Sequence, residues 1–337
     1  MPEDNSNLTL EDRIYGCLLG GMIGDAMGAP GESKTFQQIT ALFGPDGITS
    51  FAGVGTDDTA IREQLIDAIL RREGLVDCDA FAESFQRFRE ANYNLWWVPV
   101  RNAFHKYDSK VALPVDAGWG NAPSSSSAMA ISPMGILNAA NPRQAAMETF
   151  GVAGFLHGGP SGFCRDAACA MAAAVAEAFH PQATVATIIE AATKHLPPVS
   201  AHEIVDCIET ARQMARETGE YAAFRDRFYT TSLREEQCDS RETIPVALVL
   251  FEMMQGDPEQ TILSAANFGR DADTIATMVG GLCGAFQGTR GLPLRWREKV
   301  LPEMQVRYQR FAAQLAACVR QRAETAAQYA RTIEALS

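Results

Sequence analysis

The chain has 337 residues, of which 47% are apolar and 21% charged, and its formal net charge is -12 at pH 7. This length allows one large domain or two ordinary ones, and the composition is typical of globular proteins. An acidic chain without a Lys/Arg-rich run argues against nucleic-acid binding, and charge or glycine interrupts every apolar stretch long enough to cross a membrane.

The N-terminal residues and the cysteines favour a cytoplasmic protein. Residues 1–12 are polar and acidic, without the basic start and apolar core of a signal peptide. The eight cysteines form no CxxC pair, and most lie in apolar or alanine-rich stretches. We therefore expect reduced cysteines in the core rather than a disulfide framework.

A glycine-rich helix is predicted over residues 14–29. Its glycines recur every four residues and share one face, on which another helix can pack closely: Gly16, Gly20, Gly24 and Gly28. The stretch is not a phosphate-binding loop, because the Gly-Lys-Ser/Thr ending is missing. Asp25 within it is expected to make a structural hydrogen bond. Glu32 follows in a short loop, where a carboxylate can act as a general base or as an adjustable metal ligand.

Two acidic clusters open predicted helices. Thr56-Asp57-Asp58-Thr59 precedes a helix over residues 59–71, and Asp271-Ala272-Asp273-Thr274 begins one over residues 273–286. The oxygens of each cluster either cap the helix N-terminus or bind metal. Carboxylate and hydroxyl oxygens are hard donors, which suit Mg²⁺, Mn²⁺ or Ca²⁺. If the clusters meet, four carboxylates repel one another, and two divalent ions between them would relieve the repulsion and form a reactive centre.

Helical periodicity dominates the rest of the chain, and strand signals are few. Further helices are predicted over residues 165–179, 202–215, 243–254 and 259–267, and residues 303–333 form one or two amphipathic helices that pack on the body or on a second subunit. Four loops are candidates for binding: residues 30–35, 107–127, 157–165 and 228–242. We predict an all-α fold with an N-terminal tail (1–11), one compact domain (12–302) and a C-terminal helical extension packed on that domain (303–337).

In order and spacing, over roughly residues 12–300, these motifs resemble those of the ADP-ribosylglycohydrolase family. That family includes the dinitrogen-reductase-activating glycohydrolase and the ADP-ribosylhydrolases. The acidic motifs carry most of the likeness: Gly24-Asp25-Ala26-Met27-Gly28 with Glu32, Thr56-Asp57-Asp58-Thr59, and Gly269-Arg270-Asp271-Ala272-Asp273-Thr274. Weaker support comes from Glu242-Thr243-Ile244-Pro245 and Leu292-Pro293-Leu294-Arg295-Trp296.

The resemblance implies an all-α domain whose central cleft holds two divalent ions, Mg²⁺ or otherwise Mn²⁺. The ligands that it implies are Thr56, Asp57, Asp58, Asp271, Asp273 and Thr274, and the catalytic residues are Glu32, Asp57, Asp58 and Asp271. Family members cleave the bond between ribose C1 and a protein side chain or small molecule. The expected partner is an ADP-ribosylated protein or a small ribosyl compound, and the expected assembly is a monomer or homodimer.

The chain departs from the family in the loop that contacts the phosphates and the distal ribose. Here that loop covers residues 120–130, where Pro123 lacks an N–H group and Ala130 replaces an arginine. It is either a ligand loop or a flexible polar loop. Its candidate substrate contacts are Asn121, Ser124, Ser125, Ser126, Ser127 and Met129.

Other positions near the motifs have two interpretations each. His157 either binds a base or a polar ligand group, or it caps a helix end. Arg270 stands where the family often has glycine. It either binds a carboxylate or phosphate of the substrate, or pairs with Asp166 or Glu242. Two adjacent tryptophans either line a pocket or lie in the core: Trp96 and Trp97.

Three functions fit the sequence. Removal of ADP-ribose from a protein arginine is the usual activity of the family. Hydrolysis of a smaller nucleoside-like compound by an N-ribosidase would explain the altered loop. The third is non-catalytic binding of a sugar or nucleotide, against which the six intact ligand positions argue.

Overall fold

The computed structural model of the protein describes residues 8–336, and helices dominate them. Within this range the strands are limited to one antiparallel pair, β1 (Lys34–Thr35) and β2 (Gly269–Arg270). The predicted all-α fold is confirmed. None of the described helices is long and apolar enough to span a membrane. Of the expected N-terminal tail, residues 1–7 lie outside the described part of the chain, and the first helix begins at Leu10.

Two central helices, α1 (Leu10–Gly28) and α15 (Ala272–Gly291), run antiparallel and in close contact. The contact is made by backbone, because a Cβ added to the glycine face of α1 would overlap carbonyl oxygens of α15. The facing pairs are Gly16 with Gly284, Gly20 with Gly280, and Gly24 with Ala276. The close helix packing predicted from the glycine spacing is therefore confirmed.

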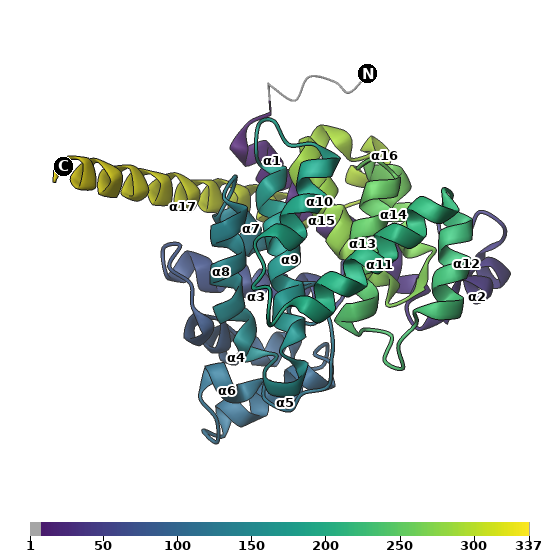
Figure 1. Cartoon of the computed structure of the whole chain (residues 1–337), viewed down its shortest axis with the longest axis horizontal. Helices are drawn as coiled ribbons and strands as arrows, with labels where there is room; N and C mark the ends of the chain where they lie inside the picture. The colour runs from purple at the N-terminus through teal and green to yellow at the C-terminus, as the bar shows by residue number, and fades with distance from the viewer. Residues whose placement is uncertain (1–7, 337) are drawn as a thin grey trace.

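The other helices surround this pair (Figure 1). They are α2 (Phe36–Phe43), α3 (Asp57–Arg71), α4 (Cys78–Asn92), α5 (Val98–Asp108), α6 (Pro114–Ala117), α7 (Ser132–Leu137), α8 (Pro142–Val152), α9 (Phe163–Ala178), α10 (Val185–Lys194), α11 (His202–Thr218), α12 (Tyr221–Thr231), α13 (Ser240–Met253), α14 (Pro258–Ala266), α16 (Leu294–Arg297) and α17 (Pro302–Glu334), with 3₁₀ turns η2 (Ala29–Gly31), η3 (Ala153–Phe155) and η4 (Gly159–Ser161). The alanine-rich α9 is buried along most of its length. All eight cysteines are free thiols, and five of them are buried.

The structure differs from the sequence prediction mainly in the loops. The loop expected over 228–242 shortens to residues 232–239, because α12 ends at Thr231 and α13 begins at Ser240. The stretch 107–127 contains α6, and the stretch 157–165 contains η4 and the start of α9. Turns this short leave no periodic pattern in the sequence. Several longer helices, α4 and α8 among them, fall where we predicted no element.

The C-terminal stretch forms one helix, α17, rather than two. Its first half packs on the body and buries Met304, Tyr308 and Leu315. Most side chains after Cys318 are exposed, and Figure 1 shows this half projecting from the body towards the C-terminus. Ser337, the last residue of the expected extension, lies outside the described residues.

We predict that Gly24→Ala lowers the free energy of unfolding by about 3 kcal/mol or more, because the new methyl group overlaps backbone that side-chain rotation cannot move. Urea unfolding measures the change. Gly151→Ala on α8 is the matched control, since a Cβ there has no heavy atom within 4 Å. It should be neutral or stabilise by less than about 1 kcal/mol. Equal stability of the two variants would contradict the backbone contact.

Candidate functional site

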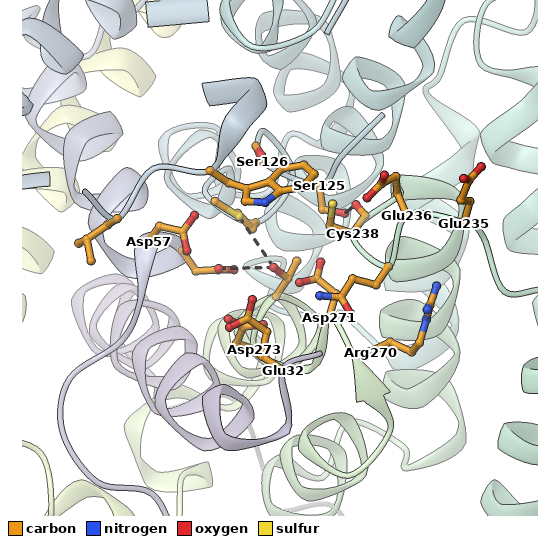
Figure 2. A pocket seen from close by; sticks show the side chains of 16 residues that line it. Glu32, Asp57, Ser125, Ser126, Glu235, Glu236, Cys238, Arg270, Asp271 and Asp273 are labelled. Atoms are coloured by element: carbon orange, nitrogen blue, oxygen red, sulfur yellow. Dashed lines mark hydrogen bonds between the residues drawn. The ribbon is translucent and has the colours of Figure 1, made fainter. Parts of the chain in front are cut away.

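A cavity of about 420 Å³ opens beside the N-terminal ends of α3 and α15. Side chains from several separate stretches of the chain converge on it, as Figure 2 shows. Most of them are acidic or polar. The lining consists of Glu32, Asp57, Asp58, Leu95, Trp97, Ser125, Ser126, Met129, Glu235, Glu236, Gln237, Cys238, Arg270, Asp271, Asp273 and Thr274.

The two acidic clusters meet at this cavity. The hydroxyl of Thr274 donates a hydrogen bond of 3.4 Å to Oδ2 of Asp58, across 216 residues of sequence. Asp57 and Asp58 are the first two residues of α3, while Asp271 immediately precedes α15 and Asp273 is its second residue. The N-termini of two helices therefore present both clusters to one space, and helix N-termini favour negative charge.

Neither helix is capped by a side chain of its acidic cluster. Thr56 and Asp271 occupy the N-cap positions of α3 and α15, but their side chains accept no hydrogen bond from the helix backbone. The capping interpretation is therefore wrong at both N-cap positions. The hydroxyl of Thr56 instead donates to Oδ1 of Asp25 (2.9 Å).

Asp25 fixes the start of α3 against α1. Its Oδ2 accepts hydrogen bonds from the backbone N–H groups of Thr56 (2.8 Å) and Thr59 (3.0 Å) and from the Thr59 hydroxyl (2.6 Å). This is the structural hydrogen bonding expected of Asp25. The sequence analysis missed a second property: one carboxylate oxygen from each of Asp25, Asp58 and Asp273 lies within 4.8 Å of the other two. The available signal was a lone carboxylate in a helix of small and apolar residues.

Three buried carboxylate oxygens of the cavity lining have no hydrogen-bond partner among the described residues: Oδ1 of Asp58, Oδ2 of Asp271 and Oδ1 of Asp273. The three side chains are at most 6% exposed. A buried carboxylate oxygen without a partner is costly, and such atoms in a native protein generally face an ion or water. Hard oxygen donors gathered in this way fit a divalent cation such as Mg²⁺ or Mn²⁺.

Burial and mutual repulsion raise the pKa values of these carboxyl groups. Burial, followed by the charge of Asp25, raises the pKa of Asp57 from 3.8 to about 7. Burial and then the same charge raise the pKa of Asp58 well above its usual value. Burial, followed by repulsion from Asp273, raises the pKa of Asp271 in the same way. Cations among these carboxylates would take the place of the protons.

Glu32 lies at the exposed rim of the cavity, directly after η2. The β1–β2 pair holds the backbone beside it, and the N–H group of Ser33 donates to the carbonyl oxygen of Arg270 (2.8 Å). Ser33 and Arg270 both have positive φ, 61° and 63°. Such left-handed conformations are unfavourable for residues other than glycine and often occur at functional sites.

Arg270 lines the cavity and pairs with Glu242. Its Nε and Nη2 donate to the two oxygens of that carboxylate at 2.8 and 3.0 Å. Glu242 has no exposed surface and also accepts from the N–H group of Arg234 (2.7 Å). Of the two ion-pair partners considered for Arg270, Glu242 is therefore the one that the structure shows; Asp166 instead accepts from Ser200.

The loop of residues 120–130, called the serine loop below, is mostly buried rather than exposed on the surface. Ser124 and Ser127 contact the two ring nitrogens of His157 (2.9 Å each), and Asn121 donates to two backbone carbonyl groups. Burial lowers the pKa of His157 to about 3 and keeps the ring neutral. Four of the expected substrate contacts line the cavity: Ser125, Ser126, Met129 and Arg270. The other four lie outside its lining: Asn121, Ser124, Ser127 and His157.

Sequence reasoning missed the outer part of the site. Glu235 and Glu236 line the cavity from the loop 232–239, where the only signal was the position of a candidate binding loop. Trp96 is buried in the core, whereas the adjacent Trp97 is 40% exposed and lines the cavity with Leu95. Both interpretations of the tryptophan pair therefore apply, one to each residue.

Comparisons with known proteins match the chain over most of its length. The family described as ADP-ribosylglycohydrolase matches residues 6–328. The chain is 29% identical to the uncharacterized protein YegU of Escherichia coli (strain K12), over 92% of the chain and 98% of that protein. It is 24% identical to the ADP-ribosylhydrolase ARH3 of Bos taurus, over 85% of the chain and 88% of that protein. A solved structure described as an ADP-ribosylglycohydrolase-related protein complex has the same fold, with a TM-score of 0.70, 22% identity, and coverage of 92% of this chain and 99% of that one.

The raised pKa values predict that the metal-free protein loses stability as pH rises from about 6.5 to about 8.5. In this range the unfolded chain has lost protons that the folded carboxyl groups keep, so unfolding becomes easier with each step in pH. The neutral His157 opposes this slope only at the lower end of the range, where the unfolded histidine still binds part of a proton; above about pH 7.5 the histidine is neutral in both states and contributes none. We expect Mg²⁺ or Mn²⁺ to raise the melting temperature most at the alkaline end, where no proton competes for the oxygens.

Thermal unfolding after chelation, with and without added cation, measures these slopes. Asp57→Asn should flatten the slope of the metal-free protein. Asp226→Asn on α12, whose side chain is 60% exposed, should leave the slope unchanged. A stability that rises with pH over this range in the metal-free protein would contradict the clustered carboxylates.

We predict that Arg270→Met destabilises the protein by about 3 kcal/mol, because it leaves the buried carboxylate of Glu242 without its cation. Methionine keeps the same backbone strain at the positive φ, so the loss reports the ion pair. The double variant Arg270→Met/Glu242→Gln should recover part of that loss. Chemical unfolding of both variants checks this, and a double variant less stable than the single one would count against the pairing.

Proposed function

The chain belongs to the ADP-ribosylglycohydrolase family, a family of glycosidic-bond hydrolases, and we propose that it hydrolyses the bond at ribose C1 of an ADP-ribosylated substrate. The substrate would be a protein side chain such as arginine or a small ADP-ribosyl compound. The cofactors would be two divalent cations, Mg²⁺ or otherwise Mn²⁺. The observation that carries the proposal is the set of buried, unpartnered aspartate oxygens that gather at one cavity.

Six side chains would hold the cations: Thr56, Asp57, Asp58, Asp271, Asp273 and Thr274. Asp25 lies close enough to Asp58 and Asp273 to join them or to orient them. Its four accepted hydrogen bonds favour the orienting role, because they already use both of its oxygens. When bound, the cations would fix the ribose hydroxyl groups and lower the pKa of a water molecule.

The carboxylates supply the remaining chemistry. In the reaction, water oxygen bonds to C1, and the bond from C1 to the leaving group breaks with its electron pair on that group. The transition state has oxocarbenium character, and the surrounding negative side chains stabilise the positive charge on the sugar. Glu32 at the rim is placed to accept the proton of the attacking water.

Of the two alternative functions, one has specific support. Hydrolysis of a smaller nucleoside-like compound is favoured by the internal hydrogen bonds of the serine loop, which occupy groups that would otherwise meet phosphates. Non-catalytic binding of a sugar or nucleotide is the third candidate. We further propose a cytoplasmic monomer or homodimer. The free state of all eight cysteines supports that compartment.

We predict that Asp58→Asn and Asp271→Asn each reduce hydrolysis at least about 100-fold, because each replaces one ligand of the paired cations by a neutral amide. The protein is incubated with Mg²⁺ or Mn²⁺ and ADP-ribosyl-arginine, O-acetyl-ADP-ribose or nucleosides, and released ADP-ribose or base is quantified. Calorimetric titration with the cation alone should show weaker binding in both variants.

Asp226→Asn serves as the control and should keep wild-type activity, since its side chain is exposed on α12. Full activity of Asp271→Asn would contradict the assigned site. If the wild-type protein binds the cation but hydrolyses none of these compounds, the result would favour the non-catalytic alternative.

A further inference from the structure

The charges of the cavity bear on what the substrate ribose carries at its 5′ position. Seven carboxylates line it: Glu32, Asp57, Asp58, Glu235, Glu236, Asp271 and Asp273. Two divalent cations would balance the four aspartates. The three glutamates, all exposed, would still give the outer part of the cavity an unbalanced negative charge. A phosphate or pyrophosphate entering this space would be repelled.

Arg270 is the one basic side chain among the described residues of the lining, and its guanidinium is already bound to other groups of the protein. Its Nε and Nη2 donate to the buried carboxylate of Glu242, and Nη2 also donates to the carbonyl oxygen of Arg234 (2.6 Å). Turning this guanidinium toward a phosphate would leave a buried carboxylate unpaired, which is strongly unfavourable. Arg270 therefore adds no net positive charge to the cavity.

The hydroxyl groups of the serine loop are also occupied. Ser125 donates its hydrogen to the carbonyl oxygen of Cys238 (2.8 Å). The hydroxyls of Ser126 and Ser124 bond to each other (2.9 Å), and Ser124 also bonds to Nε2 of His157 (2.9 Å). Each hydroxyl has a single hydrogen to donate. The serine hydroxyl groups of this loop are thus bonded within the protein.

The two outer glutamates are held at the rim. On one side of them, the N–H group of Arg234 donates to Glu242 (2.7 Å). On the other side, Nε2 of Gln237 donates to the hydroxyl of Ser33 (2.8 Å). Figure 2 shows Glu235 and Glu236 on the side of the cavity near Arg270, opposite Asp57. The residues on both sides of the two glutamates are therefore hydrogen-bonded to other parts of the protein, which keeps both negative charges at the entrance of the cavity.

An apolar surface completes the outer cavity. Leu95 and Trp97 line it, and they are 49% and 40% exposed. An indole beside carboxylates suits a planar neutral or cationic group, through stacking and cation–π attraction. It offers nothing to a phosphate.

Resting on the proposed hydrolysis at ribose C1, and on its smaller-substrate alternative in place of an ADP-ribosyl substrate, we propose that the substrate is an N-ribosyl compound without phosphate at its 5′ position, whose leaving group is a planar neutral or cationic base. Water oxygen bonds to C1, and the C1–N bond breaks with its electron pair on nitrogen. A cationic base leaves as a neutral molecule and needs no proton. The proton of the water passes to Glu32, and from there to solvent when the base is cationic or to the departing nitrogen when the base is neutral. No oxidant, reductant or phosphate donor takes part.

A matched set of substrates tests this proposal. Both anomers of N-ribosylnicotinamide, of its 5′-phosphate and of nicotinamide adenine dinucleotide contain the same C1–N bond and differ in the 5′ substituent. With the Mg²⁺- or Mn²⁺-loaded protein we expect kcat/KM to be about tenfold or more higher for the unphosphorylated compound, as like-charge repulsion predicts. Equal or higher kcat/KM for a phosphorylated member would overturn the proposal.

Charge variants show whether the glutamates cause the selection. The double variant Glu235→Gln/Glu236→Gln should reduce the preference several-fold, and so should salt at about 0.5 M, because these side chains are exposed. The double variant Glu324→Gln/Glu334→Gln on the projecting part of α17 makes the same change of net charge away from the cavity and should keep the preference. An unchanged preference in the double variant would exclude the rim glutamates as its cause and overturn the electrostatic argument.

Product binding separates failure of this proposal from failure of the proposed function. Calorimetry compares ribose, ribose 5-phosphate and ADP-ribose on the metal-loaded protein, independently of any leaving group. Tighter binding of ribose than of ADP-ribose supports the proposal even if no member of the set is hydrolysed. Tighter binding of ADP-ribose overturns it while leaving the proposed function intact. Absence of binding by all three, together with absence of hydrolysis, overturns both.

Discussion

The site depends on how closely α1 approaches its neighbours. The glycines of α1 let its backbone contact the backbone of α15 directly, so the start of α15 lies against the end of α1. Asp25, on the same helix, then ties down the start of α3 through four hydrogen bonds. One helix thus positions both acidic clusters, one by backbone contact and the other by a carboxylate. Any side chain that pushed α1 and α15 apart would also separate Asp58 from Asp273.

This arrangement holds together charges that repel one another. Burial and proximity raise the pKa values of the clustered aspartates, so the packing of the central helices must offset an electrostatic penalty. Two residues with left-handed backbone, Ser33 and Arg270, lie at the same place. Strain and repulsion that concentrate at one cavity are typical of a site whose ligand or metal is part of its stable state.

The sequence predicted those features that depend on local pattern. Glycine spacing indicated the face of α1 that α15 covers, and helical periodicity gave the main helices, because burial repeats with the turn of the helix. Partners across the fold were not predictable in this way. Glu242 was one of two candidates for Arg270, and nothing local distinguishes it from Asp166. The inward hydrogen bonds of the serine loop and the position of Glu235 depend on how distant segments meet, which no short stretch of sequence records.

The inner and outer parts of the cavity are built on different supports. The aspartates sit at the ends of packed helices, where substitution disturbs the core. The outer glutamates sit on a loop, which can change without disturbing the helices. Arg270 connects the two parts, because it belongs to the strand before Asp271 and also binds the backbone of the loop at Arg234. In this chain the arginine thus acts on the rim rather than on a ligand: it fastens the loop that carries Glu235 and Glu236. A single departure from the family pattern would then keep the reaction centre and redefine what can enter it.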